Sequence, residues 1–198
     1  MKYASAKEIA NGLLQDLAPY CNRAEIAGSI RRGKAEVGDI EIVAEPMLGL
    51  DLFGAPSPGP CALDGAIDSM VRSGYWGEAI KNGLRYKQLA LPQGINLDLF
   101  IVRPPAQWGV IFAIRTGPAE FSRWLVTQRK IGGALPSYCR VKDGAVHRGL
   151  TSRGAPIPMP EEIDFFSFVE LDWLAPENRK PTRITPMTSM RLQQRGTQ

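Results

Sequence analysis

Histidine and cysteine are scarce in this sequence. Its 198 residues contain one histidine, His147, and three cysteines, Cys21, Cys61 and Cys139. A His/Cys metal cluster, or a catalytic site built on several histidines, is therefore disfavoured. His147 lies in a turn-rich stretch, where we expect an exposed loop or strand residue. The cysteines are odd in number, widely spaced and form no CxxC pair, so we expect three reduced thiols and no disulfide framework.

Long apolar runs are also missing. No stretch approaches the roughly 20 apolar residues that a membrane-spanning helix needs. The opening Met1–Ser5 leads into an amphipathic segment, whereas a signal peptide would continue with an unbroken apolar run. The sequence therefore predicts a cytoplasmic protein with no membrane partner.

The overall composition is typical of a folded protein. Hydrophobic residues make up 44% of the chain and charged residues 22%, which is enough apolar material for a sizeable core. A length of 198 residues suits one domain or two small domains that share an interface. The net charge of +4 favours polyanions such as nucleic acid or an anionic surface, without choosing between them.

Hydrophobic periodicity predicts a mixture of helices and strands. Helices are expected at residues 5–17, 62–72, 106–114, 119–128 and 160–169, and strands at residues 23–27, 37–44, 76–80, 84–91, 95–102, 138–142 and 145–148. Ser5 and Glu8 have the spacing of a capping box at the start of the first helix. Asp143-Gly144 is typical of the turn in a hairpin between the last two strands.

The order of these elements predicts an α+β fold in two parts. Pro104-Pro105 marks a boundary. We expect a mixed β-sheet with helices over residues 1–103 and a smaller module of helices and a hairpin over residues 104–180. Residues 181–198 are polar and basic with scattered prolines, which predicts a flexible tail.

Three carboxylates stand at matching positions on two of the predicted strands. Asp39 and Glu41 are two residues apart, so their side chains point to the same face of their strand. Asp98 alternates with apolar residues on a later strand. If the two strands are neighbours, all three carboxylates face one point, where a hard cation such as magnesium or manganese would offset their repulsion. The alternative is an ordinary half-exposed strand edge, which an isolated D-x-E pattern does not exclude.

A glycine-bounded basic turn, Gly28–Gly33, ends six residues before Asp39. Its small residues let backbone N–H groups approach an anion, and Ser29 adds a hydroxyl donor. An arginine fork can pair with phosphate oxygens. An anion cradle beside metal-binding carboxylates is the layout that phosphoryl transfer requires. The alternative is a plain turn with solvated arginines.

Together these motifs resemble the signature of the DNA polymerase X (polymerase beta-like) family. Gly28–Gly33 and Gly38–Glu41 are similar to the family's GS-x-RRG and GD-x-D motifs. Leu97-Asp98-Leu99 looks like the strand that carries its third catalytic aspartate. Pro105–Gly109, followed by Thr116-Gly117, resembles the start of its nucleotide-binding thumb subdomain. The resemblance extends over roughly residues 22–180, in the family's order.

The resemblance implies a two-metal nucleotidyl transfer from a dNTP to the 3′-hydroxyl of a primer. Asp39, Glu41 and Asp98 would ligate two Mg²⁺ or Mn²⁺ ions, one activating the hydroxyl and the other holding the triphosphate. Asp98 would also accept the hydroxyl proton. The residues implied in nucleotide binding are Gly28, Ser29, Arg32 and the Gly38 backbone for the phosphates, and Thr116 and Gly117 for the sugar and base.

The resemblance also implies a minimal palm-and-thumb polymerase, similar to the smallest viral members of the family. Residues 1–103 would be the palm and residues 104–180 the thumb, and the family's lyase and helix-hairpin-helix domains have no room here. We expect a phage or viral setting, and a monomer that binds primer-template or gapped DNA. The surface cations expected to grip DNA are Lys81, Arg85, Lys87, Arg123, Arg129 and Lys130.

Three departures from the family pattern keep other functions open. The family usually has aspartate where Glu41 stands, and Asn96 stands where an arginine is often found. Ile114-Arg115 replaces the aromatic pair associated with sugar discrimination. A non-templated nucleotidyltransferase acting on RNA, protein or a small acceptor is the first alternative. The second is an inactive module that binds DNA or nucleotide, favoured only by Glu41.

Overall fold

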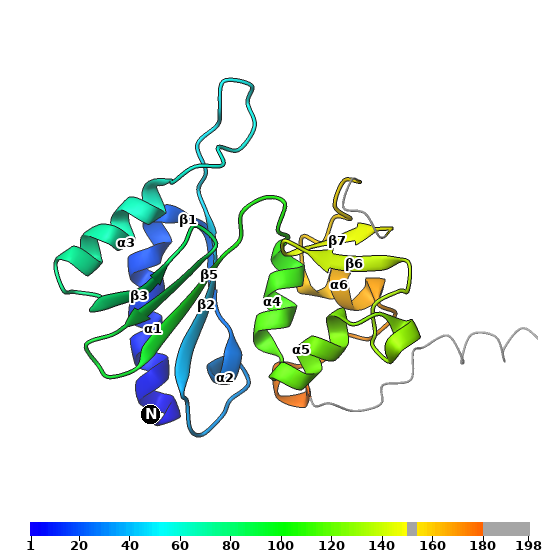
Figure 1. Ribbon diagram of the computed structural model, residues 1–198. Coiled ribbons are helices and arrows are strands. Elements are labelled where there is room, and N and C mark those ends of the chain that lie inside the picture. The colour runs from blue at the N-terminus through cyan, green and yellow to red at the C-terminus, as the bar shows by residue number, and fades with distance from the viewer. Residues whose placement is uncertain (150–153, 180–198) are drawn as a thin grey trace, which may run out of the picture. The chain divides into compact units, whose positions relative to one another are not determined.

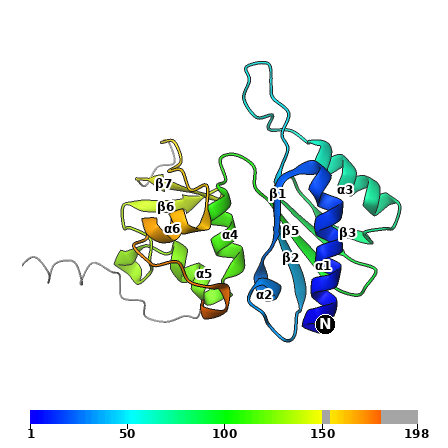
Figure 2. The same cartoon turned by 180° about the vertical axis from the view of Figure 1, so that it is seen from behind.

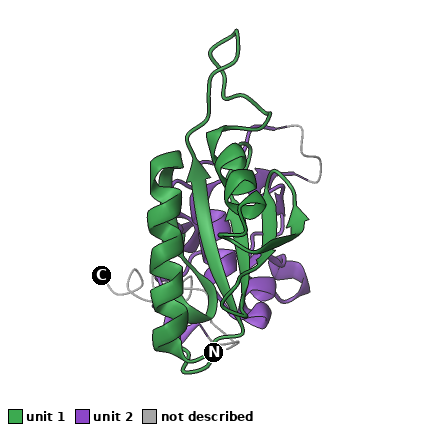
Figure 3. Ribbon diagram, turned by 90° about the vertical axis from the view of Figure 1, so that its left-hand side faces the viewer, with its two compact units in different colours: residues 1–106 green, residues 107–198 purple. Residues whose placement is uncertain are grey.

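Figure 1 shows the computed structural model of the protein, which describes residues 1–149 and 154–179. The chain forms two compact units, Met1–Ala106 and Gln107–Gln198, which Figure 3 colours separately. Both units contain helices and strands, so the predicted α+β class is confirmed. The division between the units falls three residues after the predicted boundary at residue 103.

The first unit is built on a five-stranded sheet in the order β1-β2-β5-β4-β3. The strands are β1 (Cys21–Ile26), β2 (Asp39–Pro46), β3 (Glu78–Asn82), β4 (Tyr86–Ala90) and β5 (Asn96–Ile101). β2 and β5 are parallel neighbours, whereas the other pairs are antiparallel. The sheet is therefore mixed, as predicted, and the two strands that carry the candidate carboxylates lie side by side.

Two helices cover one face of this sheet. They are α1 (Tyr3–Leu17) and α3 (Ala62–Arg72), and Figure 3 shows both in front of the strands. Their apolar stripes pack onto alternate strand residues. The core that they form with the sheet includes Ala10, Leu17, Ile67, Ile40, Ile42, Leu97 and Leu99. The intervening residues of β2 and β5 consequently point to the opposite face.

The first helix begins differently from the prediction. Its N-cap is Lys2, which makes no side-chain capping bond, and Ser5 lies inside the helix. The backbone N–H of Tyr3 donates to the Ala35 carbonyl at 3.1 Å, and Lys2 forms an isolated β-bridge with Glu36. The predicted capping box is therefore wrong, because pairing with the chain before β2 satisfies the start of the helix.

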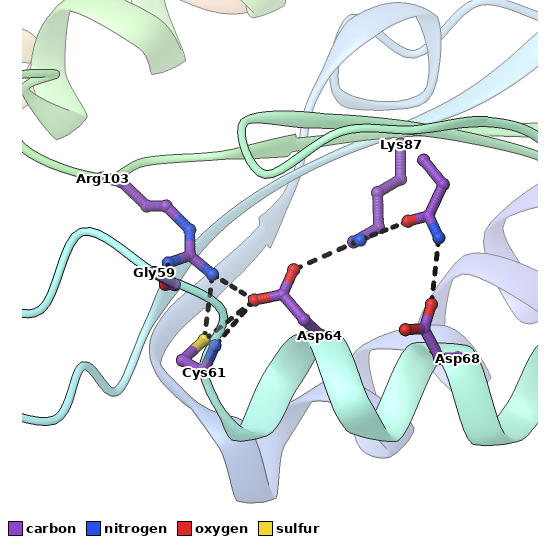
Figure 4. A network of polar contacts seen from close by, with 7 residues as sticks. Gly59, Cys61, Asp64, Asp68, Lys87 and Arg103 are labelled. Carbon is purple, nitrogen blue, oxygen red and sulfur yellow. Dashed lines mark hydrogen bonds and ion pairs between the residues drawn. The ribbon is translucent and has the colours of Figure 1, made fainter.

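A buried charge network fastens α3 to the sheet (Figure 4). Asp64 on α3 forms ion pairs with Arg103 and with Lys87, whose Nζ lies 3.2 Å from Asp64 Oδ1. All three side chains are almost fully buried. The prediction that Lys87 is a surface cation is wrong, because Lys87 is the register partner of Leu99 and points to the helix-covered face.

A long loop, predicted from the glycines and prolines of residues 46–60, separates β2 from α3. It projects from the first unit as a finger in Figures 1 and 2. At its tip the side chains of Leu52 and Phe53 are 100% and 93% exposed. Asp51 Oδ1 accepts hydrogen bonds from the N–H groups of Phe53 and Ala55, each at 2.9 Å. The tip is therefore a defined turn that holds two large apolar side chains in solvent.

The described part of the second unit, residues 107–149 and 154–179, combines three α-helices with a hairpin. Its elements are α4 (Trp108–Thr116), α5 (Ala119–Val126), β6 (Cys139–Lys142), β7 (Ala145–Arg148) and α6 (Glu162–Phe168). Asp143 and Gly144 have φ values of 50° and 77°, as a two-residue type I′ turn requires, so the predicted hairpin is confirmed. Short 3-10 turns occur at Ala18–Tyr20, Arg129–Ile131 and Pro176–Asn178.

Expectations about single residues have mixed outcomes. His147 lies on β7 as one alternative predicted, but it is buried, and its Nδ1 is 3.2 Å from the Gly154 carbonyl. The expected exposure is wrong because β7 is buried along most of its length. All three cysteines are free thiols, as predicted. The expected tail, residues 181–198, falls outside the described residues.

Candidate functional site

The three predicted carboxylates share one face of the sheet. Asp39 and Glu41 alternate with buried isoleucines on β2, and Asp98 on β5 is the register partner of Glu41. Because β2 and β5 are parallel and directly paired, Asp98 stands beside Glu41, and Asp39 is one pleat away. The two strands that carry the carboxylates are therefore neighbours, which the predicted clustering of the three carboxylates required.

Electrostatics connect Asp39 with both Asp98 and the basic turn. Asp39 is half-buried, and this burial is the largest influence raising the pKa of its carboxyl group above the ordinary value. The negative charge of Asp98 raises the pKa further, whereas the Arg32 guanidinium and a backbone hydrogen bond lower it. The face thus concentrates negative charge that Arg32 offsets only in part.

Asp98 is held by two side chains from β4 that the sequence argument missed. Its Oδ1 accepts hydrogen bonds from the Tyr86 hydroxyl and from Gln88 Nε2, each at 2.9 Å. Gln88 is the register partner of Asp98, and Tyr86 is the partner of Phe100. The alternation of residues along β4 shows from the sequence that Tyr86 and Gln88 share one face of the strand. That this face lies beside Asp98 follows only from the β4–β5 register.

Glu41 lies directly against the basic turn. A Cβ atom added to Gly28 would come within 1.8 Å of Glu41 Oε2, and Gly28 has a φ of +59°. The N–H of Ala27 donates to the Glu41 carbonyl at 2.8 Å. Only glycine therefore combines this backbone conformation with so close an approach of the carboxylate.

The basic turn folds as a single helical turn, α2 (Gly28–Arg31). The Arg32 N–H donates to the Gly28 carbonyl at 3.1 Å, and the Gly33 N–H donates to the Ile30 carbonyl at 3.0 Å. The Ser29 Oγ is buried and has no hydrogen-bond partner among the described residues. A buried hydroxyl without a partner is costly, and a phosphate oxygen is one group that would satisfy it.

The metal site stays a prediction. Within residues 1–149 and 154–179, no three His, Cys, Asp or Glu side chains gather closely enough to hold a metal ion. Glu41 lies against Gly28, and Asp98 Oδ1 faces the donors of β4. The raised pKa of Asp39 nevertheless fits a cation, because repelling carboxylates of this kind are the oxygen donors that magnesium and manganese prefer.

The two remaining nucleotide-binding candidates belong to the second unit. Thr116 is the last residue of α4 and is fully buried. Gly117 follows it, and a Cβ there would lie 2.7 Å from Phe121 Cδ1 and 2.8 Å from Ser122 Oγ. The close start of α5 explains the glycine at this turn. Contact of Thr116 and Gly117 with a nucleotide stays a prediction.

The candidate DNA-binding cations divide into two groups. Lys81, Arg85, Arg123 and Lys130 are exposed, as the prediction requires. Arg129 is only partly exposed: its Nη2 donates to the Val169 carbonyl at 2.8 Å, and its Nη1 pairs with Glu170 at 3.2 Å. The prediction of a surface role is therefore wrong for the buried Lys87. Arg129 packs within its own unit, and its contact with DNA stays a prediction.

Comparison with protein-family models and with curated protein sequences finds no match for this chain. Among the described helices, none has the length and apolar character needed to cross a membrane.

Proposed function

We propose that the protein is a metal-dependent nucleotidyltransferase, and specifically a DNA-directed DNA polymerase of the X-family type. The observation that carries the proposal is the adjacency of Asp39, Glu41 and Asp98 on the paired strands β2 and β5. The turn that contains Ser29 precedes β2 in the sequence. In this proposal the first unit is the palm and the second unit is the thumb. The proposed activity of the protein is the filling of short gaps in DNA.

The phosphates of the incoming nucleotide would bind at the basic turn. The Ser29 hydroxyl, which has no hydrogen-bond partner within residues 1–149 and 154–179, offers a hydrogen bond. Arg32 offers a guanidinium that already acts electrostatically on Asp39. Gly28 leaves no side chain between this turn and Glu41. A phosphate bound at this turn would therefore lie close to the Glu41 carboxylate, and a bound cation would have to offset their repulsion.

The reaction proposed is attack of a primer 3′-hydroxyl on the α-phosphate of the nucleotide, with pyrophosphate as the leaving group. Bound Mg²⁺ or Mn²⁺, held by Asp39, Glu41 and Asp98, would supply the positive charge that brings a triphosphate to an acidic face. Asp98 would accept the hydroxyl proton. Thr116 and Gly117 would bind the sugar and base.

Primer extension on a DNA duplex with a one-nucleotide gap tests this function. Each dNTP and each rNTP is supplied singly against each template base, with Mg²⁺ or Mn²⁺. We expect addition of the dNTP that matches the template. We also expect the Asp98→Ala variant to lose at least about a thousandfold in rate, because the acceptor of the proton and a metal ligand are removed together.

A non-templated nucleotidyltransferase is the second candidate function. It is favoured by Ile114-Arg115, which stands where the related family has its aromatic pair. In the same gap assay, addition that ignores the template base and still requires Asp98 would select this candidate. If the correctly folded protein binds DNA and dNTP but adds no nucleotide, both enzymatic functions are contradicted and an inactive binding module is supported.

A further inference from the structure

We propose that Tyr86 and Gln88 are positioning residues that fix the Asp98 carboxylate and reserve its Oδ2 for the reaction. This inference rests on the proposed function of Asp98, but it concerns side chains on a different strand. Both hydrogen bonds, from the Tyr86 hydroxyl and from Gln88 Nε2, end on the same oxygen, Oδ1. A carboxylate oxygen has two lone pairs, and two donors occupy them.

The strand register explains why these two side chains meet Asp98. Gln88 lies directly opposite Asp98 across the antiparallel β4–β5 pair. Tyr86 is two residues away on the same face of β4, at the diagonal distance that long aromatic side chains can reach. The donors therefore come from rigid strand positions, and their hydrogen bonds set the rotation of the carboxylate about its Cβ–Cγ bond.

Tyr86 is itself held in place by its neighbours. Its ring stacks on Phe100 with a centroid separation of 5.1 Å and an interplanar angle of 22°. Lys81 Nζ lies 5.4 Å from the centroid of the Tyr86 ring. Because the ring is packed independently of its hydroxyl, replacement by phenylalanine removes the hydrogen bond to Asp98 and keeps the packing.

The chemistry of the donors matters as well as their position. A phenol and a carboxamide are neutral, so they orient Asp98 without cancelling its charge. A lysine or arginine in the same place would cancel that charge. With neutral donors the carboxylate keeps its net negative charge, and its Oδ2 lies outside these two hydrogen bonds. In the proposed function, Oδ2 is the oxygen with which Asp98 would bind the metal and accept the proton of the attacking hydroxyl.

The test compares the wild-type chain with Tyr86→Phe and Gln88→Met. Methionine is chosen because it keeps the length of glutamine and removes its donor. Binding of Mn²⁺ is measured directly from the loss of the free-ion signal in electron paramagnetic resonance. We expect the dissociation constant for Mn²⁺ to rise about 10- to 100-fold in each variant, the range typical when a partner of a metal ligand is removed. The rate constant for gap filling should fall by a similar factor, while the KM for gapped DNA stays unchanged.

Lys81→Met is the matched control for Mn²⁺ binding alone, because it removes a contact with the Tyr86 ring and leaves both hydrogen bonds to Asp98 intact. Its gap filling is not compared, since Lys81 is a candidate DNA-binding cation. This variant should bind Mn²⁺ as the wild type does. A loss of thermal stability in Tyr86→Phe or Gln88→Met with unchanged Mn²⁺ affinity would assign these residues a purely structural role and overturn the inference.

The outcome also separates this inference from the proposed function. If the wild-type chain binds Mn²⁺ and fills gaps, and both variants match it, the positioning role is wrong and the polymerase function stands. If the wild-type chain neither binds Mn²⁺ nor extends a primer, the proposed function fails and the positioning role fails with it.

Discussion

Two neighbouring residues of β4, Lys87 and Gln88, each bind a carboxylate, but on opposite faces of the sheet and with opposite charge compensation. On the helix-covered face, Lys87 pairs with Asp64, which also pairs with Arg103. On the other face, Gln88 donates a hydrogen bond to Asp98. The first carboxylate is fully compensated by cations of the protein, whereas the second is oriented by neutral donors. Asp64 therefore fastens α3 to the sheet, whereas the neutral partners of Asp98 are those that its proposed role as a ligand of a metal would require.

The pKa directions agree with this contrast. Burial alone would raise the pKa of Asp64, but hydrogen bonds from the Cys61 N–H and Lys87, together with the charge of Arg103, hold it below its ordinary value. The pKa of Asp39 on the other face is raised by burial and by Asp98. The ionised form of Asp64 therefore stabilises the fold, whereas the ionised form of Asp39 costs stability through its burial and its proximity to Asp98.

Removal of Asp64 should have the largest effect on stability. Asp64→Ala leaves Lys87 and Arg103 buried without their shared partner, which typically costs about 3–5 kcal/mol. The change in the free energy of unfolding can be measured by denaturant titration. Asp68→Ala is the control on the same helix, where the partner Asn82 is exposed, and it should cost less than about 1 kcal/mol. Equal losses in the two variants would remove the distinction between a compensated and an ordinary carboxylate.

Gly28→Ala should have the second largest effect, on the face of the candidate site. Gly33→Ala provides the comparison, because both glycines have positive φ but only Gly28 contacts Glu41. We expect Gly33→Ala to destabilise by about 1–2 kcal/mol through backbone strain alone. The overlap with Glu41 should add about 1–3 kcal/mol in Gly28→Ala. Thermal unfolding of both variants measures the difference, and equal stabilities would show that Glu41 does not depend on Gly28.

The sequence predicted the elements and the carboxylate face well, because both follow from local periodicity. The helix at Ala62–Arg72 was predicted to the residue, and alternation alone put Asp39 and Glu41 on one side of their strand. It missed the partners of the carboxylates. Lys87 looks like any surface lysine until the strand order shows that its side chain faces α3. Such pairings connect residues that are distant in sequence, and no local pattern encodes them.

Asp39→Asn should have the smallest effect on stability, and one of opposite sign. Its raised pKa means that the ionised carboxyl group costs the folded state free energy. Asparagine has nearly the same shape and no charge. At neutral pH without metal we expect a gain of less than about 1 kcal/mol, because the side chain is half-exposed and solvent screens its charge. Gap filling by this variant should be lost, because a proposed metal ligand is removed.

The pH dependence of this gain is the sharper test. In the wild type, the cost of Asp39 is fully present above its folded pKa. It disappears as the pH falls towards the ordinary aspartate value of 3.8, because the folded state then carries the protonated acid. The stability advantage of Asp39→Asn should therefore shrink over that range, whereas stability contributed by Asp64 is lost as the pH falls through its lowered pKa. Denaturant titrations of the wild type and Asp39→Asn at neutral and acidic pH measure this. An advantage for Asp39→Asn that grows on acidification would contradict a raised pKa of Asp39 in the folded state.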